Sequence, residues 1–378
     1  MTKAKILYGV CGIGLGHTFR QLPIIDHYAR TSRVVIFGFG ESYKFYSQRF
    51  QGSKSVTVLP VCVPFYVGGP HGIDFAATAA RPGNFTERLA LNCESMAAAE
   101  RLIGRPDLVV SDYEPNAALY AYAKAAQLVT IDQQSKYLVG EFPAALHRQC
   151  FDDEVARLRM FFPKADARIA CSFFRVPPRP RAECRERVLL LPPILKDEIL
   201  SLQLRRPDRK SILVYISSQR AFPQPLDEVA RACASHPEWD FHIFLPQAEA
   251  HRSSFGSHAN VALHKPGDSE FYAILARCRG IISTAGHSLL SEAMYLGIPV
   301  YAIPLPVYEQ QMNAHVIAAH GFGASHQRVS ARSLARFLRS VPEFAVNILT
   351  DKRVLLRGCG PHRIIRYLAQ RFNVPDMY

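Results

Sequence analysis

Short apolar runs alternate along the chain with longer stretches in which apolar residues recur every three or four positions. The short runs contain few polar positions, which is typical of parallel strands buried on both faces. The longer stretches are typical of amphipathic helices. In the first half of the chain the pattern predicts strands at Ile6–Val10, Arg33–Gly38, Ser55–Pro60, Asp107–Asp112, Val129–Asp132 and Arg168–Ser172, and helices at His17–Arg30, Arg81–Gly104 and Ala117–Ala126.

A second alternating series follows a stretch rich in Pro and Arg, Val176–Arg181, which cannot form regular structure. Its predicted strands are Ser211–Ile216, Phe241–Leu245, Val261–Leu263, Gly280–Ile282 and Val300–Ala302. Strands that alternate with helices predict parallel, doubly wound sheets. We therefore expect an α/β protein with two Rossmann-like domains facing a cleft, over residues 1–200 and 205–360, and a C-terminal helix within residues 361–378 that packs back on the first domain.

Composition excludes several classes of protein. With 48% hydrophobic and 20% charged residues, the chain is typical of a globular protein. No apolar run approaches the ~20 residues of a membrane helix, and no signal peptide is evident. The nine cysteines contain no C-x-x-C pair, so we expect reduced thiols, no zinc site and a cytoplasmic location.

The net charge of +13 is the one unusual feature of the composition. Solvated surface charge explains it as well as a polyanionic partner does, either anionic lipid or nucleic acid. The basic residues fall into three groups: Arg168, Arg175, Arg179, Arg181, Arg185 and Arg187; Arg205, Arg206, Arg209 and Lys210; and Lys352, Arg353, Arg357, Arg363, Arg366 and Arg371.

One segment of the second half combines a strand, a tight turn and a helix start. Gly280–Ile282 leads through small residues to Gly286, after which a helical pattern begins. Free N–H groups and the positive end of the helix dipole favour phosphate at such a point. Glu292 lies in the second turn of the helix, where a carboxylate suits the hydroxyl groups of a ribose.

This spacing resembles the donor-site signature of nucleotide-sugar glycosyltransferases with two Rossmann-like domains, the GT-B fold. These include the N-acetylglucosaminyltransferase that forms lipid II and the UDP-glycosyltransferases. The resemblance implies a diphosphate held by Gly286, His287 and Ser288, a ribose held by Glu292, and a donor sugar held by Glu309 and Gln310. It also implies phosphate contacts from Ser218 and Gln219, and a nucleobase near Phe271. Where many UDP-glycosyltransferases have His and Trp, this chain has Thr284 and His287, which argues against the plant-type branch.

The first strand leads into a glycine-rich turn that ends at His17. Its glycines at 12, 14 and 16 do not match the dinucleotide spacing G-x-G-x-x-G, although Glu41 leaves a dehydrogenase open as a minor alternative. The turn resembles the first loop of the lipid II-forming enzyme. With Ser111–Pro115, a Ser-Asp-x-Glu-Pro element, it resembles still more a group of uncharacterised prokaryotic glycosyltransferases.

Glycosyl transfer requires a base for the acceptor hydroxyl, and His17 is suited to that role. The helix dipole predicts a lowered pKa, and therefore a neutral imidazole, at this helix start. Asp112 could orient its tautomer, with Glu114 as a rival base; capping roles for His17 or Asp112 are the structural alternatives. Gly14 and Gly16 would form the loop for phosphate or acceptor.

Attack without a protein nucleophile implies inversion. In the absence of a D-x-D motif, we expect no metal requirement and no cofactor beyond the donor. The expected partners are a nucleotide sugar, by resemblance a UDP-sugar, and an acceptor lipid or glycan at an anionic membrane surface. We expect no obligate protein partner. Such an acceptor would allow peripheral association with the inner membrane face. A hydroxymethylated DNA base is the alternative acceptor. A nucleotide-sugar epimerase and a non-catalytic binding protein are the alternative functions.

Overall fold

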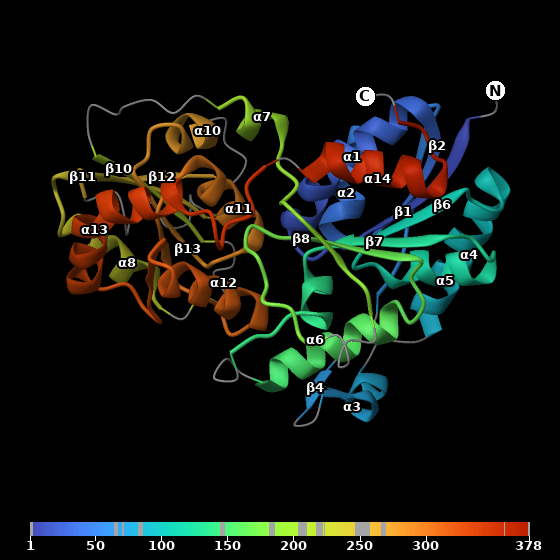
Figure 1. Cartoon of the computed structure of the whole chain (residues 1–378), viewed down its shortest axis with the longest axis horizontal. Helices are drawn as coiled ribbons and strands as arrows, with labels where there is room; N and C mark the ends of the chain where they lie inside the picture. The colour runs from blue at the N-terminus through green and yellow to red at the C-terminus, as the bar shows by residue number, and fades with distance from the viewer. Residues whose placement is uncertain are drawn as a thin grey trace. The chain divides into compact units, whose positions relative to one another are not determined.

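The computed structural model describes residues 3–63, 67–69, 72–81, 86–143, 148–180, 186–202, 210–216, 222, 224–245, 258–265, 270–358 and 360–376 (Figure 1). The chain forms two compact units. Unit 1 comprises residues 1–172, 176–196 and 359–378, and unit 2 comprises residues 173–175 and 197–358. The chain therefore enters unit 2 briefly at 173–175 before it leaves unit 1 at residue 196.

Unit 1 contains a seven-stranded sheet in the order β3-β2-β1-β6-β7-β8-β9, with every neighbouring pair parallel. A small antiparallel hairpin pairs β4 with β5. The strands are β1 (Ala4–Val10), β2 (Ser32–Gly38), β3 (Val56–Pro60), β4 (Val67–Gly69), β5 (Gly72–Asp74), β6 (Leu108–Asp112), β7 (Leu128–Asp132), β8 (Ala167–Cys171) and β9 (Leu189–Leu191). The helices are α1 (Leu15–Thr31), α2 (Gly40–Arg49), α3 (Phe75–Ala80), α4 (Thr86–Ile103), α5 (Pro115–Ala123), the 3₁₀ helix η1 (Gln134–Leu138), α6 (Arg148–Phe161) and α14 (Gly360–Phe372).

Unit 2 contains a six-stranded parallel sheet in the order β12-β11-β10-β13-β14-β15. Its strands are β10 (Lys210–Tyr215), β11 (Trp239–Phe244), β12 (Val261–His264), β13 (Gly280–Ser283), β14 (Val300–Ala302) and β15 (Gly323–Ser325). Its helices are α7 (Asp197–Leu200), α8 (Leu226–Ala234), α10 (Glu270–Leu275), α11 (His287–Leu296), α12 (Tyr308–Ala319) and α13 (Ala331–Thr350).

The two sheets share one topology. In each, the first strand of the unit lies in the middle, two later strands extend the sheet on one side, and the remainder extend it on the other. The order reverses between β1 and β6 in unit 1 and between β10 and β13 in unit 2. Ligands of doubly wound sheets bind at this reversal, beyond the carboxyl ends of the strands.

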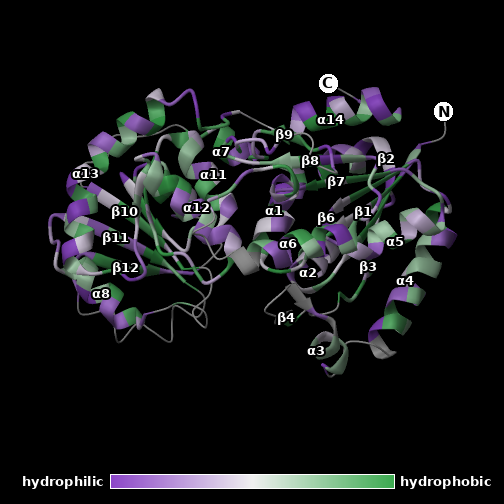
Figure 2. Cartoon of the chain, turned by 60° about the horizontal axis from the view of Figure 1, so that its bottom comes forward, coloured by the Kyte–Doolittle hydropathy of each residue, from purple (hydrophilic) through white to green (hydrophobic). Residues whose placement is uncertain are grey.

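The predicted strands all coincide with observed ones, and the expectation of two Rossmann-like α/β domains is confirmed. Central strands are buried throughout: all residues of β6, β7 and β13 are inaccessible or nearly so. Figure 2 shows hydrophobic colour along the strands and both colours on the helices around them. This is the distribution expected when helices cover both faces of a parallel sheet.

Helix α14 belongs to unit 1. Its buried residues Ile364, Ile365, Leu368 and Phe372 join the same apolar cluster as Ile24, Ile25 and Tyr28 of α1. Arg363, Arg366 and Arg371 lie on its exposed side. The last helix of the chain thus completes the core around the first helix and the first strand.

Candidate functional site

The turn between β1 and α1 uses its glycines for two different reasons. A Cβ on Gly12 would lie 1.6 Å from the backbone oxygen of Phe39, so this glycine lets the start of α2 approach the turn. Gly14 precedes α1 with φ 72°, a left-handed conformation, and a Cβ there would meet nothing within 4 Å. Packing therefore demands glycine at position 12, whereas at Gly14 only the backbone conformation favours it. Gly16 lies in the first turn of α1.

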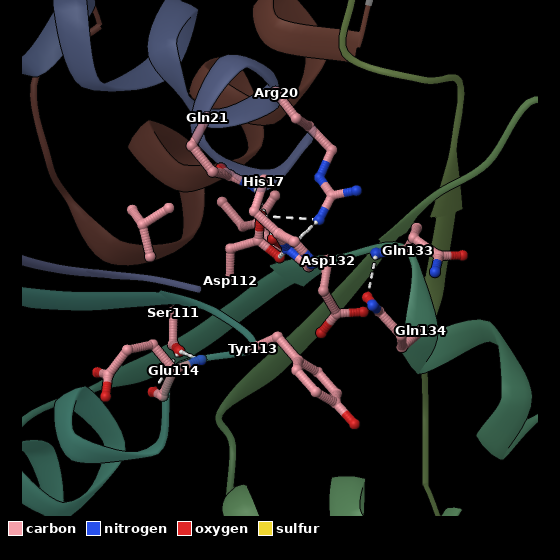
Figure 3. A network of polar contacts seen from close by, with 12 residues as sticks. His17, Arg20, Gln21, Ser111, Asp112, Tyr113, Glu114, Asp132, Gln133 and Gln134 are labelled. Atoms are coloured by element: carbon pink, nitrogen blue, oxygen red, sulfur yellow. Dashed lines mark hydrogen bonds and ion pairs between the residues drawn. The ribbon is translucent and has the colours of Figure 1, made fainter. Parts of the chain in front are cut away.

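His17 projects from α1 to the end of β6 and contacts Asp112. The distance from His17 Nδ1 to Asp112 Oδ1 is 3.0 Å (Figure 3). The Asp112 side chain is completely buried, whereas that of His17 keeps 15% of its surface exposed. Because β1 and β6 are paired, with Val10 opposite Asp112, the helix that follows β1 starts directly beside the end of β6. The structure thus brings together the two residues that the sequence proposed as base and orienting carboxylate.

Two further residues of α1 contact the same carboxylate, and neither was predicted from the sequence. Arg20 Nη2 lies 2.8 Å from each oxygen of Asp112, and Gln21 Nε2 donates to Oδ2 at 2.8 Å. Gln21 also donates to the Ile131 carbonyl at 2.9 Å and accepts from the hydroxyl group of Tyr8. Arg20 and Gln21 follow His17 by three and four residues, which places them on one face of the helix. That spacing was the available signal.

The charge state of this cluster differs from the expectation. Burial lowers the pKa of His17, and so does the positive charge of Arg20. Cys11 and Asp112 raise it by more, so the pKa of His17 is raised to about 10. Although burial works against ionisation of Asp112, Arg20 and His17 lower the pKa of its carboxyl. The raised pKa disagrees with the predicted neutral imidazole, because Cys11 and the Asp112 carboxylate together favour the imidazolium more than burial and Arg20 disfavour it.

Glu114 is a helix cap. Its Oε1 accepts from the N–H of Asn116 at 2.8 Å and its Oε2 from the N–H of Ala117 at 2.7 Å, so both oxygens serve the first turn of α5. The residue is completely buried, and Figure 3 shows its carboxyl turned away from His17. These contacts argue against Glu114 as the rival base. They also assign the capping role that was considered for Asp112 to Glu114.

The end of β7 and the segment after it add further buried polar side chains. Asp132 accepts from the backbone N–H and the hydroxyl group of Ser135, and burial raises the pKa of its carboxyl to about 6. Lys136, also completely buried, donates to Gln133 Oε1 at 2.7 Å. Polar side chains therefore gather beyond the ends of the neighbouring strands β6 and β7.

In unit 2 the predicted turn follows β13 and opens α11. Gly286 is the N-cap of α11, with φ −65° and no side-chain cap. A Cβ on it would meet nothing within 4 Å, so neither packing nor backbone conformation requires glycine here. The N–H of His287 donates to Glu309 Oε1 at 3.3 Å. Glu309, in the first turn of α12, thus places a carboxylate at the N-terminus of α11.

The other residues that the resemblance assigned to the donor have separate surroundings. Gln310 Oε1 accepts from the Leu305 N–H at 2.9 Å and braces the loop before α12. Glu292 contributes to raising the pKa of Tyr215, after burial, so the two lie near each other. Phe271, on α10, packs edge-on against Tyr215 with ring centroids 6.2 Å apart. Ser288 lies in the first turn of α11, and Ser218 and Gln219 lie outside the described residues.

Ala285 and Tyr113 are strained at equivalent places in the two sheets. Ala285 has φ 60° and comes shortly after β13, and Tyr113 has φ 56° and comes shortly after β6. In each sheet this is the strand next to the first strand of the unit, at the point where the strand order reverses. A non-glycine residue in this conformation costs about 1–3 kcal/mol and is concentrated at functional sites.

In the described residues, no group of three or more His, Cys, Asp or Glu side chains is placed to hold a metal ion. No helix among them is both long and apolar enough to cross a membrane.

Comparison with known proteins agrees with this architecture. A family model described as glycosyl transferase family 1 matches residues 4–342. Three solved structures are similar over nearly their whole length. CalG4, the calicheamicin glycosyltransferase, is 18% identical with a TM-score of 0.58, covering 98% of this chain and 99% of that one. A UDP-glucose:anthocyanidin 3-O-glucosyltransferase in complex with UDP is 14% identical with a TM-score of 0.64, covering 92% and 93%. MurG of Acinetobacter baumannii is 12% identical with a TM-score of 0.61, covering 97% and 99%. No curated protein matches the chain.

Proposed function

The chain belongs to glycosyl transferase family 1, and from that premise we propose that it transfers a sugar from a UDP-sugar to an acceptor hydroxyl with inversion at the anomeric carbon. The observation that carries the mechanism is the contact between His17 Nδ1 and Asp112 Oδ1 beyond the carboxyl ends of β1 and β6. A histidine held through Nδ1 by a buried carboxylate leaves Nε2 to take a proton.

In the proposed reaction, His17 Nε2 takes the proton of the acceptor hydroxyl as its oxygen attacks the anomeric carbon. The bond from that carbon to the diphosphate oxygen breaks, and the displaced UDP carries away the electron pair. Asp112 stabilises the imidazolium that forms, because its carboxyl remains ionised beside Arg20. General-base catalysis of this kind contributes about 10²–10⁴-fold to the rate.

The donor is proposed to lie at the N-terminus of α11. Open space in front of Gly286 allows a diphosphate to approach the N-terminus of that helix, where the dipole favours negative charge. Glu292 would hold the ribose, and Glu309 and Gln310 the sugar. UDP is the nucleotide named for one structure of the same fold. The diphosphate would leave without a metal, since the helix terminus stabilises its charge.

A lipid or glycan at an anionic membrane surface is the proposed acceptor. It accommodates the net charge of +13, part of which lies on the exposed side of α14 at Arg363, Arg366 and Arg371. Arg168, assigned to a basic group from sequence, does not contribute to such a surface. It is buried and donates to the Phe162 carbonyl.

The test is a screen of UDP-sugars for UDP release, each with and without anionic lipid extract, glycan or hydroxymethylated duplex DNA. We expect release with one sugar and only beside lipid or glycan. His17→Ala should retain donor binding and lose about 10²–10⁴-fold of the rate. Because the imidazolium predominates below its raised pKa, the rate of the wild-type protein should rise with pH toward about 10.

Each other outcome contradicts a stated part of the proposal. Release beside DNA alone would replace the acceptor, and a retained anomeric configuration in the product would exclude the inverting mechanism. Isomerisation of the UDP-sugar without an acceptor would make the protein an epimerase. Donor binding without turnover would make it a binding protein. Failure of every UDP-sugar to bind would overturn the donor site.

A further inference from the structure

Arg20 contacts both members of the His17–Asp112 pair through a single nitrogen atom. Its Nη2 lies 2.8 Å from both carboxylate oxygens of Asp112 and also 2.8 Å from His17 Nδ1. This nitrogen carries two hydrogens, so it cannot donate fully to three acceptor atoms. Figure 3 shows the guanidinium group reaching down from α1 to the point where His17 meets Asp112.

The two contacts of His17 Nδ1 demand opposite protonation. A bond to Asp112 needs a hydrogen on Nδ1, whereas a bond from Arg20 needs the Nδ1 lone pair. A neutral imidazole that accepts from Arg20 carries its hydrogen on Nε2, and that nitrogen cannot then act as a base. A neutral imidazole that donates to Asp112 keeps the Nε2 lone pair.

We propose that Arg20 is a positioning residue that competes with His17 for Asp112 and thereby sets the tautomer and the proton affinity of the histidine. This inference extends the proposed function and rests on it, because the tautomer of His17 matters for catalysis only if His17 is the base. Arg20 is only 7% exposed, and its partner carboxylate is also held by Gln21, so the guanidinium group stays beside the pair.

The charge balance around His17 supports this role. The groups that face it are Cys11 in the β1–α1 turn, Arg20 on α1 and Asp112 on β6, with Tyr113 stacked at a ring-centroid distance of 6.4 Å. Asp132, the last residue of β7, interacts electrostatically with both Asp112 and Arg20. Among these groups Arg20 is the cation that lowers the pKa of His17, and it also lowers the pKa of Asp112. Without it, a histidine beside an unshared carboxylate would hold its proton more tightly.

The experiment follows the His17 imidazole by ¹⁵N NMR in the full-length chain, without substrate, assigning its signals by their loss in His17→Asn. We expect the wild-type protein to titrate near pH 10 and to show the Nε2–H tautomer among its neutral forms. Arg20→Met should hold the proton at least about ten-fold more tightly, one pH unit, and show only Nδ1–H. Arg20→Lys retains the cation and should lie between the two.

The matched control is Arg49→Met, which removes an arginine that is paired with Asp26 on α1 at 2.7 Å. It should leave the titration of His17 unchanged. A midpoint and tautomer in Arg20→Met equal to those of the wild-type protein would overturn the inference, as would a wild-type midpoint near 6.5. Thermal unfolding of Arg20→Lys and Arg20→Met identifies a loss of folding. The NMR result does not depend on sugar transfer, so failure of the proposed function remains a separate outcome.

Discussion

Asp112 and Glu114 are two residues apart and both completely buried, yet their surroundings give them opposite properties. Arg20 and His17 hold the pKa of the Asp112 carboxyl low, despite its burial. Among the described residues the hydrogen bonds to the Glu114 carboxyl come from amide N–H groups, and burial raises its pKa to about 7. Only the first is thus a dependable anion at neutral pH, which suits it to stabilise a histidine cation.

Replacing Glu114 by Ala should destabilise unit 1. The N–H groups of Asn116 and Ala117 would lose their acceptor, which costs at least about 2 kcal/mol of unfolding free energy. Between about pH 4.5 and 7 the folded protein binds a proton at Glu114 that the unfolded chain releases, so this group's contribution to stability falls as the pH rises. Denaturant unfolding should therefore show a larger deficit at pH 5 than at pH 8.

An equal deficit at both pH values would show instead that Glu114 is ionised throughout. The control is Glu343→Ala on the exposed face of α13, which removes a carboxylate without a capping role and should alter stability by less than about 0.5 kcal/mol.

At this scale the sequence could identify candidates but not their contacts. Motif spacing singled out His17 and Asp112, which the fold brings together. It could not distinguish which acidic residue of Ser111–Pro115 caps α5, because either Asp112 or Glu114 precedes the helix. Arg20 was missed because an arginine on an amphipathic helix ordinarily faces solvent; its burial depends on a carboxylate 92 residues away.

The two turns that open α1 and α11 look alike in sequence but use glycine differently. Gly12 fills a position where the start of α2 leaves no space for a Cβ, whereas Gly286 borders open space. The first glycine serves packing within unit 1, and the second is free to serve a ligand.

Paired alanine substitutions test this contrast. Gly12→Ala must displace the Phe39 backbone and should cost about 1–3 kcal/mol or more in unfolding free energy. Gly286→Ala should cost less than about 1 kcal/mol, as an N-cap change, but weaken UDP binding at least about ten-fold, or 1.4 kcal/mol. Calorimetry of unfolding and of UDP titration measures both. Unchanged UDP affinity in a folded Gly286→Ala protein would contradict the diphosphate assignment.

Elements with a long apolar run or a clear helical period were predictable from sequence. The strands β4, β5, β9 and β15 were missed, each only three residues long and too short to establish a period. Helix α5 begins earlier than predicted, at Pro115, because Glu114 supplies a cap and proline is tolerated in the first turn.

At the scale of the whole molecule, unit 1 depends on residues from both ends of the chain. Leu368 of α14 is completely buried in the cluster that contains Ile24 and Tyr28. Leu334 of α13 is equally buried in the cluster of unit 2. The two leucines therefore offer matched probes of the two units.

Truncation of either leucine to Ala should cost about 2–5 kcal/mol, but in different places. Hydrogen exchange followed by mass spectrometry should show faster exchange in β1, β6 and α1 for Leu368→Ala, and in β10 and β13 for Leu334→Ala. Faster exchange in both sheets from either substitution would show that the units unfold as one.

The return of α14 to unit 1 also has a consequence for synthesis on the ribosome. Unit 2 ends at residue 358, and every strand of its sheet has been made by residue 325, whereas unit 1 lacks part of its core until residues 360–376 have been translated. Domains generally fold as units as they emerge. The domain that begins first in the sequence is thus the last to be completed, and the nascent chain holds the His17–Asp112 pair in an unfinished domain while the turn before α11 already has its full sheet.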